Sequence, residues 1–70
     1  MIINGPAFKE LRESQMMSKF FLAKASGVSP TVINRLELSK FISPELMRRV
    51  LSVLNITPEE AFSKKMLLHS

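Results

Sequence analysis

The residues whose types and spacing could do chemistry concentrate between positions 18 and 37. Within this stretch a polar row is predicted on one side of a short helix: Pro30, Thr31, Asn34 and Arg35. Hydroxyl, amide and guanidinium groups arranged in this way can hydrogen-bond to base edges in a DNA major groove. Arg35 is the best suited, because its planar fork can bond O6 and N7 of guanine together. A contact to a phosphate and a solvent-exposed side chain are the two alternatives for Arg35.

Patterns for catalysis or metal binding are not found in the sequence. The one histidine, His69, is the penultimate residue, where chain ends commonly fray. Glu10 with Glu13, and Glu59 with Glu60, lie in the first turns of predicted helices, where carboxylates favour the helix dipole or are solvated. No Cys is present and the two Gly are far apart, so neither a thiolate site nor a phosphate-binding glycine loop can be assembled. We expect no enzyme activity, no metal and no cofactor.

The composition predicts one small basic domain over residues 1–70. A chain of 70 residues buries about 60% of its surface on folding, which supports a single modest core. The net charge of +4 favours an anionic partner. The longest stretch without charge, residues 25–34, is broken by Gly27 and Pro30 and is far shorter than the roughly 20 apolar residues of a membrane helix. An uncharged start followed by Gly5-Pro6 is unlike a secretory signal, and the absence of Cys fits a reducing cytoplasm.

Five short helices are predicted from the positions of the prolines and of one serine. Each proline follows a residue acceptable as an N-cap, in the pairs Gly5-Pro6, Ser29-Pro30, Ser43-Pro44 and Thr57-Pro58. Ser18 marks the fifth helix start, and Gly27 suits a left-handed end for that helix. Thr57 and Glu60 have the spacing of a capping box. The expected fold is therefore all-α, with negligible β structure, a core over residues 6–62 and a tail over residues 63–70.

The spacing of apolar residues agrees with these helices. Phe8, Leu11 and Met16 are expected to mark the buried side of the first helix. In the fourth helix the apolar residues fall at i, i+3, i+4 and i+7, as expected of a helical stripe: Met47, Val50, Leu51 and Leu54.

Residues 18–37 have the organisation of a helix-turn-helix, because Gly27 ends one helix and Ser29-Pro30 starts another at a new angle. Leu22, Ala23, Val28, Ile33 and Leu36 would form its inner side. The segment resembles the lambda-repressor/Cro-like (Xre-type) helix-turn-helix family. The residues that carry the resemblance are Met17-Ser18-Lys19-Phe20-Phe21-Leu22-Ala23, Gly27-Val28-Ser29 and Ile33-Asn34-Arg35-Leu36-Glu37.

The resemblance implies a five-helix DNA-binding domain and a role for individual residues. Pro30, Thr31 and Arg35 would face bases, with Asn34 at the edge of the row, and Ser29 would cap the recognition helix. Arg12 and Glu37 would form an ion pair that orients Arg12 near the DNA backbone. Phosphate contacts are expected from a wider set, with solvent exposure as the alternative for its lysines: Arg12, Ser18, Lys19, Ser29, Lys40 and Ser43.

The sequence departs from the family pattern at several positions. Leu38-Ser39 stands where the family usually has Asn-Gly, and phenylalanines stand at three positions that are commonly polar or basic: Phe20, Phe21 and Phe41. These phenylalanines are either partly buried against neighbouring helices or contact a dimer or protein partner. The last helix and tail offer a further apolar series at helical spacing: Phe62, Met66, Leu67 and Leu68. Ile2 and Ile3 could instead pair as a short strand between two copies.

The function expected from these observations is sequence-specific binding of double-stranded DNA by a homodimer, which would repress transcription from a palindromic operator. A bacterial, phage or mobile-element origin follows from the resemblance, and so does a nucleoid-associated location in the cytoplasm. The alternative is a protein-partner-binding module of the same fold, such as a toxin-neutralising antitoxin. No membrane association is expected.

Overall fold

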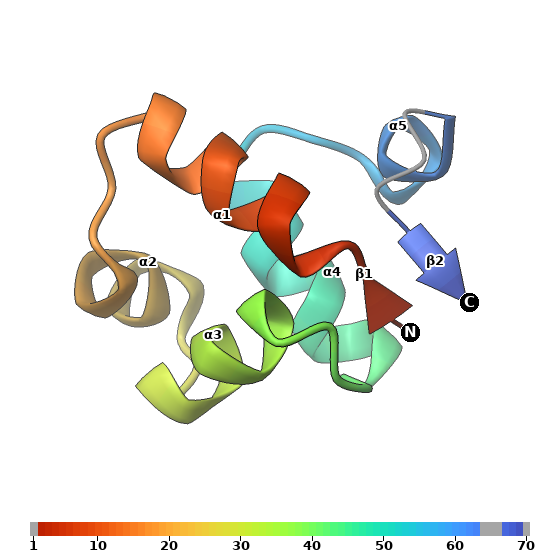
Figure 1. Ribbon diagram of the computed structural model, residues 1–70. Helices are drawn as coiled ribbons and strands as arrows, with labels where there is room; N and C mark the ends of the chain where they lie inside the picture. Colours follow the sequence, from red (N-terminus) through yellow and green to blue (C-terminus); the bar gives the residue numbers. More distant parts are fainter. Residues whose placement is uncertain (1, 64–66, 70) are drawn as a thin grey trace.

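A computed structural model describes residues 2–63 and 67–69 of the chain, with side chains for residues 2–57 and 59–61. The elements of this part are, in chain order, β1 (Ile2–Ile3), α1 (Gly5–Ser14), α2 (Lys19–Ser26), α3 (Pro30–Glu37), α4 (Pro44–Val53), α5 (Pro58–Ser63) and β2 (Leu67–His69). The described residues thus contain the five predicted helices. Helix α2 packs against α3 and α4, and α1 packs against α3 (Figure 1).

The helix starts follow the local signals, with one correction. The Ser18 and Ser43 hydroxyls accept hydrogen bonds from the N–H groups of Phe21 at 3.0 Å and Leu46 at 3.5 Å. Helix α1, however, is capped by Asn4 and not by Gly5, because the Asn4 Oδ1 accepts from the Ala7 N–H at 3.2 Å. A glycine has no side chain with which to make this bond, so the cap moves one residue toward the chain start.

Gly5 serves a different purpose, which is a close approach between α1 and the end of α3. A Cβ at this position would lie 2.7 Å from the Glu37 carbonyl carbon and 2.9 Å from the Ser39 Oγ, and would meet the Glu37 carbonyl oxygen. The Gly5 N–H donates to the Ser39 Oγ at 2.8 Å. Ser39 adopts a left-handed conformation with φ of 56°, so it fills the place of the Asn-Gly pair that ends this helix in the family.

The hydrophobic core lies between the helices and includes the whole predicted stripe of α4. Met47, Val50 and Leu51 have no exposed surface, and Leu54 is 2% exposed. The prediction for Met16 is wrong, since its side chain is 94% exposed. Helix α1 ends at Ser14, and Met16 takes a φ of 58°, which turns its side chain out of the helical register.

The two ends of the chain pair as an antiparallel two-stranded ribbon (Figure 1). Ile2 lies opposite His69 and Ile3 opposite Leu67, with an irregularity between the two pairs. Leu67 and Leu68 therefore lie in a strand and do not continue the helical face that their spacing suggested, and β1 finds its partner within the same chain. A two-residue strand leaves its backbone polar groups without a partner, and pairing with β2 satisfies them. Ile3 becomes a fully buried core residue.

Candidate nucleic-acid interface

The helix-turn-helix consists of α2, a tight turn and α3. Gly27 has a φ of 71° and ends α2 in the left-handed conformation, as predicted. The Val28 N–H donates to the Ala23 carbonyl at 3.0 Å, and the half-buried Val28 packs against the core. Leu22 and Ile33 are fully buried and lie on opposite sides of this turn. The turn therefore holds α3 at a fixed angle to α2.

Helix α3 divides into a buried side and an exposed polar side. Ile33 and Leu36 have no exposed surface. The four residues of the predicted row are all exposed: Pro30, Thr31, Asn34 and Arg35. This arrangement presents one hydroxyl, one amide and one guanidinium on a single helix face, while the other face is anchored in the core.

Two residues of the polar row are held by neighbours. The Arg35 Nη2 donates to the Phe41 carbonyl at 2.9 Å, so this side chain is linked to the loop after α3. The Asn34 Oδ1 accepts from the Lys19 Nζ at 3.3 Å. Lys19 is the first residue of α2, so its ammonium crosses from the start of one helix to the polar side of the next.

Ser29 occupies the N-cap position of α3, but its hydroxyl makes no capping hydrogen bond. The Val32 N–H, which a capping hydroxyl would engage, donates to the Ser29 backbone carbonyl at 3.0 Å. Pro30 removes a further donor from this helix start. The expectation that Ser29 caps the helix is therefore met by its backbone conformation, with φ of −75° and ψ of 155°, and not by its side chain.

The expected ion pair between Arg12 and Glu37 is present and buried. The Arg12 Nε donates to the Glu37 Oε2 at 2.9 Å, and the two side chains are 8% and 9% exposed. The Arg12 Nη1 also donates to the Met17 carbonyl at 2.6 Å. Arg12 thus connects α1, the residue before Ser18 and the last residue of α3.

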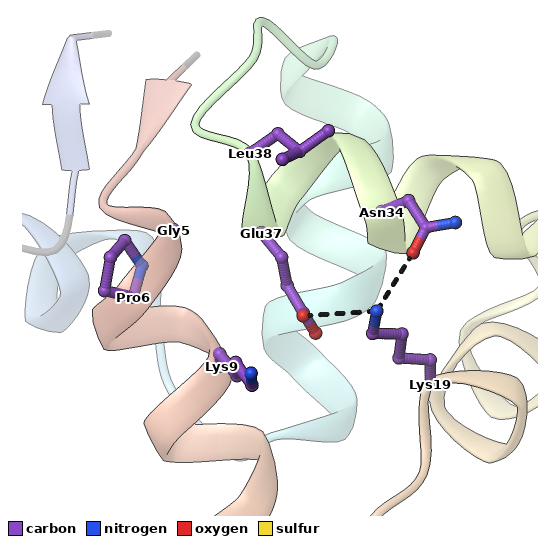
Figure 2. Close-up of a pocket in the computed structure, with 7 residues that line it drawn as sticks. All are labelled: Gly5, Pro6, Lys9, Lys19, Asn34, Glu37 and Leu38. Atoms are coloured by element: carbon purple, nitrogen blue, oxygen red, sulfur yellow. Dashed lines mark hydrogen bonds and ion pairs between the residues drawn. The ribbon is translucent and has the colours of Figure 1, made fainter.

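Lys19 is a third member of this charged group, and the sequence did not reveal it. Its Nζ lies 3.6 Å from the Glu37 Oε1, the oxygen that Arg12 Nε does not use. The only sign of this contact in the sequence is the opposite charge of positions 19 and 37. Many other pairs of positions also carry opposite charges, so the sign does not identify this pair. Figure 2 shows the Lys19 ammonium between Glu37 and Asn34, with dashed lines to both.

An open pocket of about 570 Å³ lies beside this group, between the start of α1 and the end of α3 (Figure 2). Its lining combines two cations with apolar surface and consists of Gly5, Pro6, Lys9, Lys19, Asn34, Glu37 and Leu38. Lys40 and Ser43 lie further along the chain, exposed in and after the loop that follows α3.

Exposed aromatic surface is found where the sequence departs from the family. Phe20, Phe21 and Phe41 are 69%, 55% and 59% exposed. Leu38, which the sequence analysis named only as a departure at the helix end, is 66% exposed. The tail series lies largely outside this description: Met66 is not among the described residues, and the side chains of Phe62, Leu67 and Leu68 are not described.

The described residues contain neither a candidate metal site nor a candidate membrane-spanning helix. No group of three or more potential metal-ligating side chains was found in residues 2–63 and 67–69. Within the same part of the chain, no helix is long and apolar enough to cross a membrane.

Comparison with known proteins assigns the family. A helix-turn-helix family model matches residues 8–60, which cover α2, the turn, α3 and α4 as well as most of α1. The searches of curated proteins and of solved structures gave no match. The family match includes the polar row of α3 and the three charged residues behind it. The chain belongs to the lambda-repressor/Cro-like (Xre-type) helix-turn-helix family of DNA-binding regulators.

Proposed function

We propose that the protein is a sequence-specific transcriptional regulator that inserts α3 into the major groove of double-stranded DNA. The observation that carries this proposal is the polar side of α3, where Thr31, Asn34 and Arg35 are exposed on a helix anchored through its opposite face. An α-helix fits the major groove, and these side chains offer the donors and acceptors that distinguish base pairs there. Pro30 would contribute only an apolar contact at the start of the helix.

Arg35 is the residue to which we assign the strongest base contact. Its hydrogen bond to the Phe41 carbonyl engages one N–H of Nη2 and restrains the side chain at the exposed end of α3. A guanidinium has five N–H donors, so donors for guanine O6 and N7 remain. Restraint before binding reduces the side-chain entropy lost in the complex, which favours affinity.

Phosphate contacts would fix the register of α3 on the duplex. The proposed set surrounds the polar row and consists of Ser18, Lys19, Ser29, Lys40, Ser43 and Arg12. Lys19 and Lys40 would supply full charges, and the serines lie at helix starts whose N–H groups attract phosphate oxygens. Arg12 already engages Glu37 and Met17 through Nε and Nη1, so Nη2 is the group that would approach the backbone.

We further propose that the protein binds as a homodimer to a palindromic operator and represses by occluding polymerase. One recognition helix contacts only a few base pairs, and a two-fold dimer doubles the sequence that is read. Half-sites would then lie about one helical turn apart.

Selection of bound sequences from a random duplex library, at two salt concentrations, tests this function. A palindromic motif that persists at the higher salt is the expected result, because base contacts depend less on salt than phosphate contacts do. Binding that disappears at the higher salt and enriches no sequence would refute a sequence-specific function.

A second candidate function is binding of a protein partner, such as a toxin neutralised by this chain. The observation in its favour is the exposure of Phe20, Phe21 and Phe41, since exposed apolar side chains often mark interaction sites. Co-expression with the product of an adjacent toxin-like reading frame, followed by sedimentation of the purified protein, tests it. A 1:1 complex that the change of Phe20 and Phe21 to serine abolishes would support this function, and co-expression without a complex would count against it.

A further inference from the structure

The ammonium of Lys19 lies between a side chain of the polar row and the buried ion pair. Its Nζ is 3.3 Å from the Asn34 Oδ1 and 3.6 Å from the Glu37 Oε1. Glu37 is itself fixed, because its other oxygen accepts from Arg12 at 2.9 Å and its side chain is 9% exposed. The buried pair therefore provides a rigid anchor for Lys19, and Lys19 in turn holds Asn34.

The donors of Lys19 are sufficient for these two contacts and one more. A protonated lysine has three N–H donors and no acceptor. One of them serves the hydrogen bond to Asn34, a second is enough for the ion pair with Glu37, and the side chain is still 48% exposed. The third donor is available for a DNA phosphate, so a phosphate contact does not require Lys19 to release Asn34.

The contact with Lys19 fixes which way the amide of Asn34 faces. A cation can bond only to the amide oxygen, so Oδ1 is turned toward Lys19 and the NH₂ group is turned away from it, as Figure 2 shows. An asparagine reads adenine by using both ends of the amide, with Oδ1 accepting from N6 and Nδ2 donating to N7. A positive charge beside Oδ1 repels the amino groups of adenine and cytosine, whereas the free NH₂ group can donate to any acceptor.

We propose that Lys19 is a positioning residue that sets the base preference of Asn34, by holding its amide as a hydrogen-bond donor toward guanine or thymine and against adenine and cytosine. Guanine O6 and N7 and thymine O4 are acceptors that such a donor would meet. Adenine N7 is an acceptor too, but the N6 amino group beside it would face the Lys19 ammonium. This inference rests on the proposed function, since it requires α3 to read bases. It gives Lys19 a part in sequence specificity beyond its charge.

The test is selection of bound sequences with the 70-residue protein and three variants: Asn34→Ala, Lys19→Met and Lys9→Met. Asn34→Ala identifies the base-pair position that Asn34 reads, as the position whose preference disappears. At that position the wild-type protein should select guanine or thymine. In Lys19→Met the Asn34 amide is free to turn. The affinity for duplexes with adenine at that position, relative to duplexes with the base that the wild-type protein selects, should then rise at least about fivefold. This is the lower bound of the discrimination that one bidentate contact provides.

Lys9→Met is the matched control for the loss of charge. Lys9 lines the same pocket, and within the described part of the chain its side chain makes no hydrogen bond or ion pair. Its removal lowers the net charge by the same amount, so any effect on affinity should be equal for all sequences and the ratio between bases should not change. Because Lys19→Met also weakens binding in general, the ratios are measured by competition between two duplexes at reduced salt.

Three outcomes overturn the inference while leaving the proposed function intact. The first is a wild-type preference for adenine at the Asn34 position, the second is an unchanged ratio in Lys19→Met, and the third is an Asn34→Ala motif identical to that of the wild type. If the wild-type protein enriches no motif at all, the proposed function itself fails. A circular dichroism spectrum of each variant confirms that it is folded.

Discussion

The Glu37 Oε2 accepts a hydrogen bond from the Arg12 Nε at 2.9 Å, and this pair joins the last residue of α3 to the last turn of α1. Both side chains are more than nine-tenths buried. Breaking a buried pair by removing one partner leaves an uncompensated charge, which costs about 3–5 kcal/mol. The pair therefore fixes the position of α3 relative to α1. Removing either of its side chains should lower the stability of the fold.

Glu37→Ala is expected to lower the free energy of unfolding by about 3 kcal/mol or more, because it leaves the buried Arg12 charge without its partner. Urea denaturation measures the change, provided that the slope of the transition is preserved. Glu45→Ala is the matched control, since it removes one partner of an exposed ion pair. In that pair the Arg49 side chain is 50% exposed and the Glu45 side chain is 76% exposed. That change should cost less than about 1 kcal/mol. Equal losses in the two variants would contradict a structural role for the buried pair.

The two glycines should respond to alanine for different reasons. Gly5→Ala forces α1 away from the Glu37 carbonyl and should cost about 1–3 kcal/mol, as overpacking does. Gly27→Ala meets no atom within 4 Å, so its cost is the strain of a φ of 71°, about 1–2 kcal/mol. The two losses are distinguished by crystal structures, in which the α1–α3 distance should increase in Gly5→Ala and not in Gly27→Ala. An unchanged distance in both variants would refute the close-approach argument.

Ile3 should contribute to stability as a core residue although it lies next to the chain start. Its side chain has no exposed surface, so Ile3→Ala should lower the free energy of unfolding by about 2–5 kcal/mol. Ile2→Ala, at a half-buried neighbour in the same strand, should cost less than half as much. Thermal or urea unfolding compares the two variants. Similar small losses would mean that β1 does not close the core.

Arg35→Ala and Lys40→Ala should separate base reading from phosphate binding. Arg35→Ala is expected to relax the preference at one base pair by about 1–3 kcal/mol, because a bidentate contact to guanine is lost. Lys40→Ala should weaken binding to all sequences alike and reduce the slope of log affinity against log salt by about one. Titration of matched and single-mismatch duplexes at several salt concentrations gives both quantities. An Arg35→Ala variant that keeps the wild-type motif would show that Arg35 contacts only the backbone or solvent.

Much of the fold could be predicted from the sequence because its signals are local. The bond from the Phe21 N–H to Ser18, the positive φ of Gly27 and the prolines at helix starts each depend on residues that are neighbours along the chain. Helical spacing similarly determined which side of α4 is buried, since positions three and four apart share one face. The outward position of Thr31 and Arg35 follows from the same geometry once Ile33 and Leu36 face inward.

Only the tertiary structure decided the contacts between residues far apart in the chain. It paired residues 67–69, whose apolar residues continue a helical spacing, as a strand with β1, and it exposed Met16 by ending α1 at Ser14. It also placed Lys19 between Glu37 and Asn34, which no spacing in the sequence could indicate. Hydrogen bonds and ion pairs of this kind act over about 3–4 Å, so they depend on how whole helices pack and not on the order of residues.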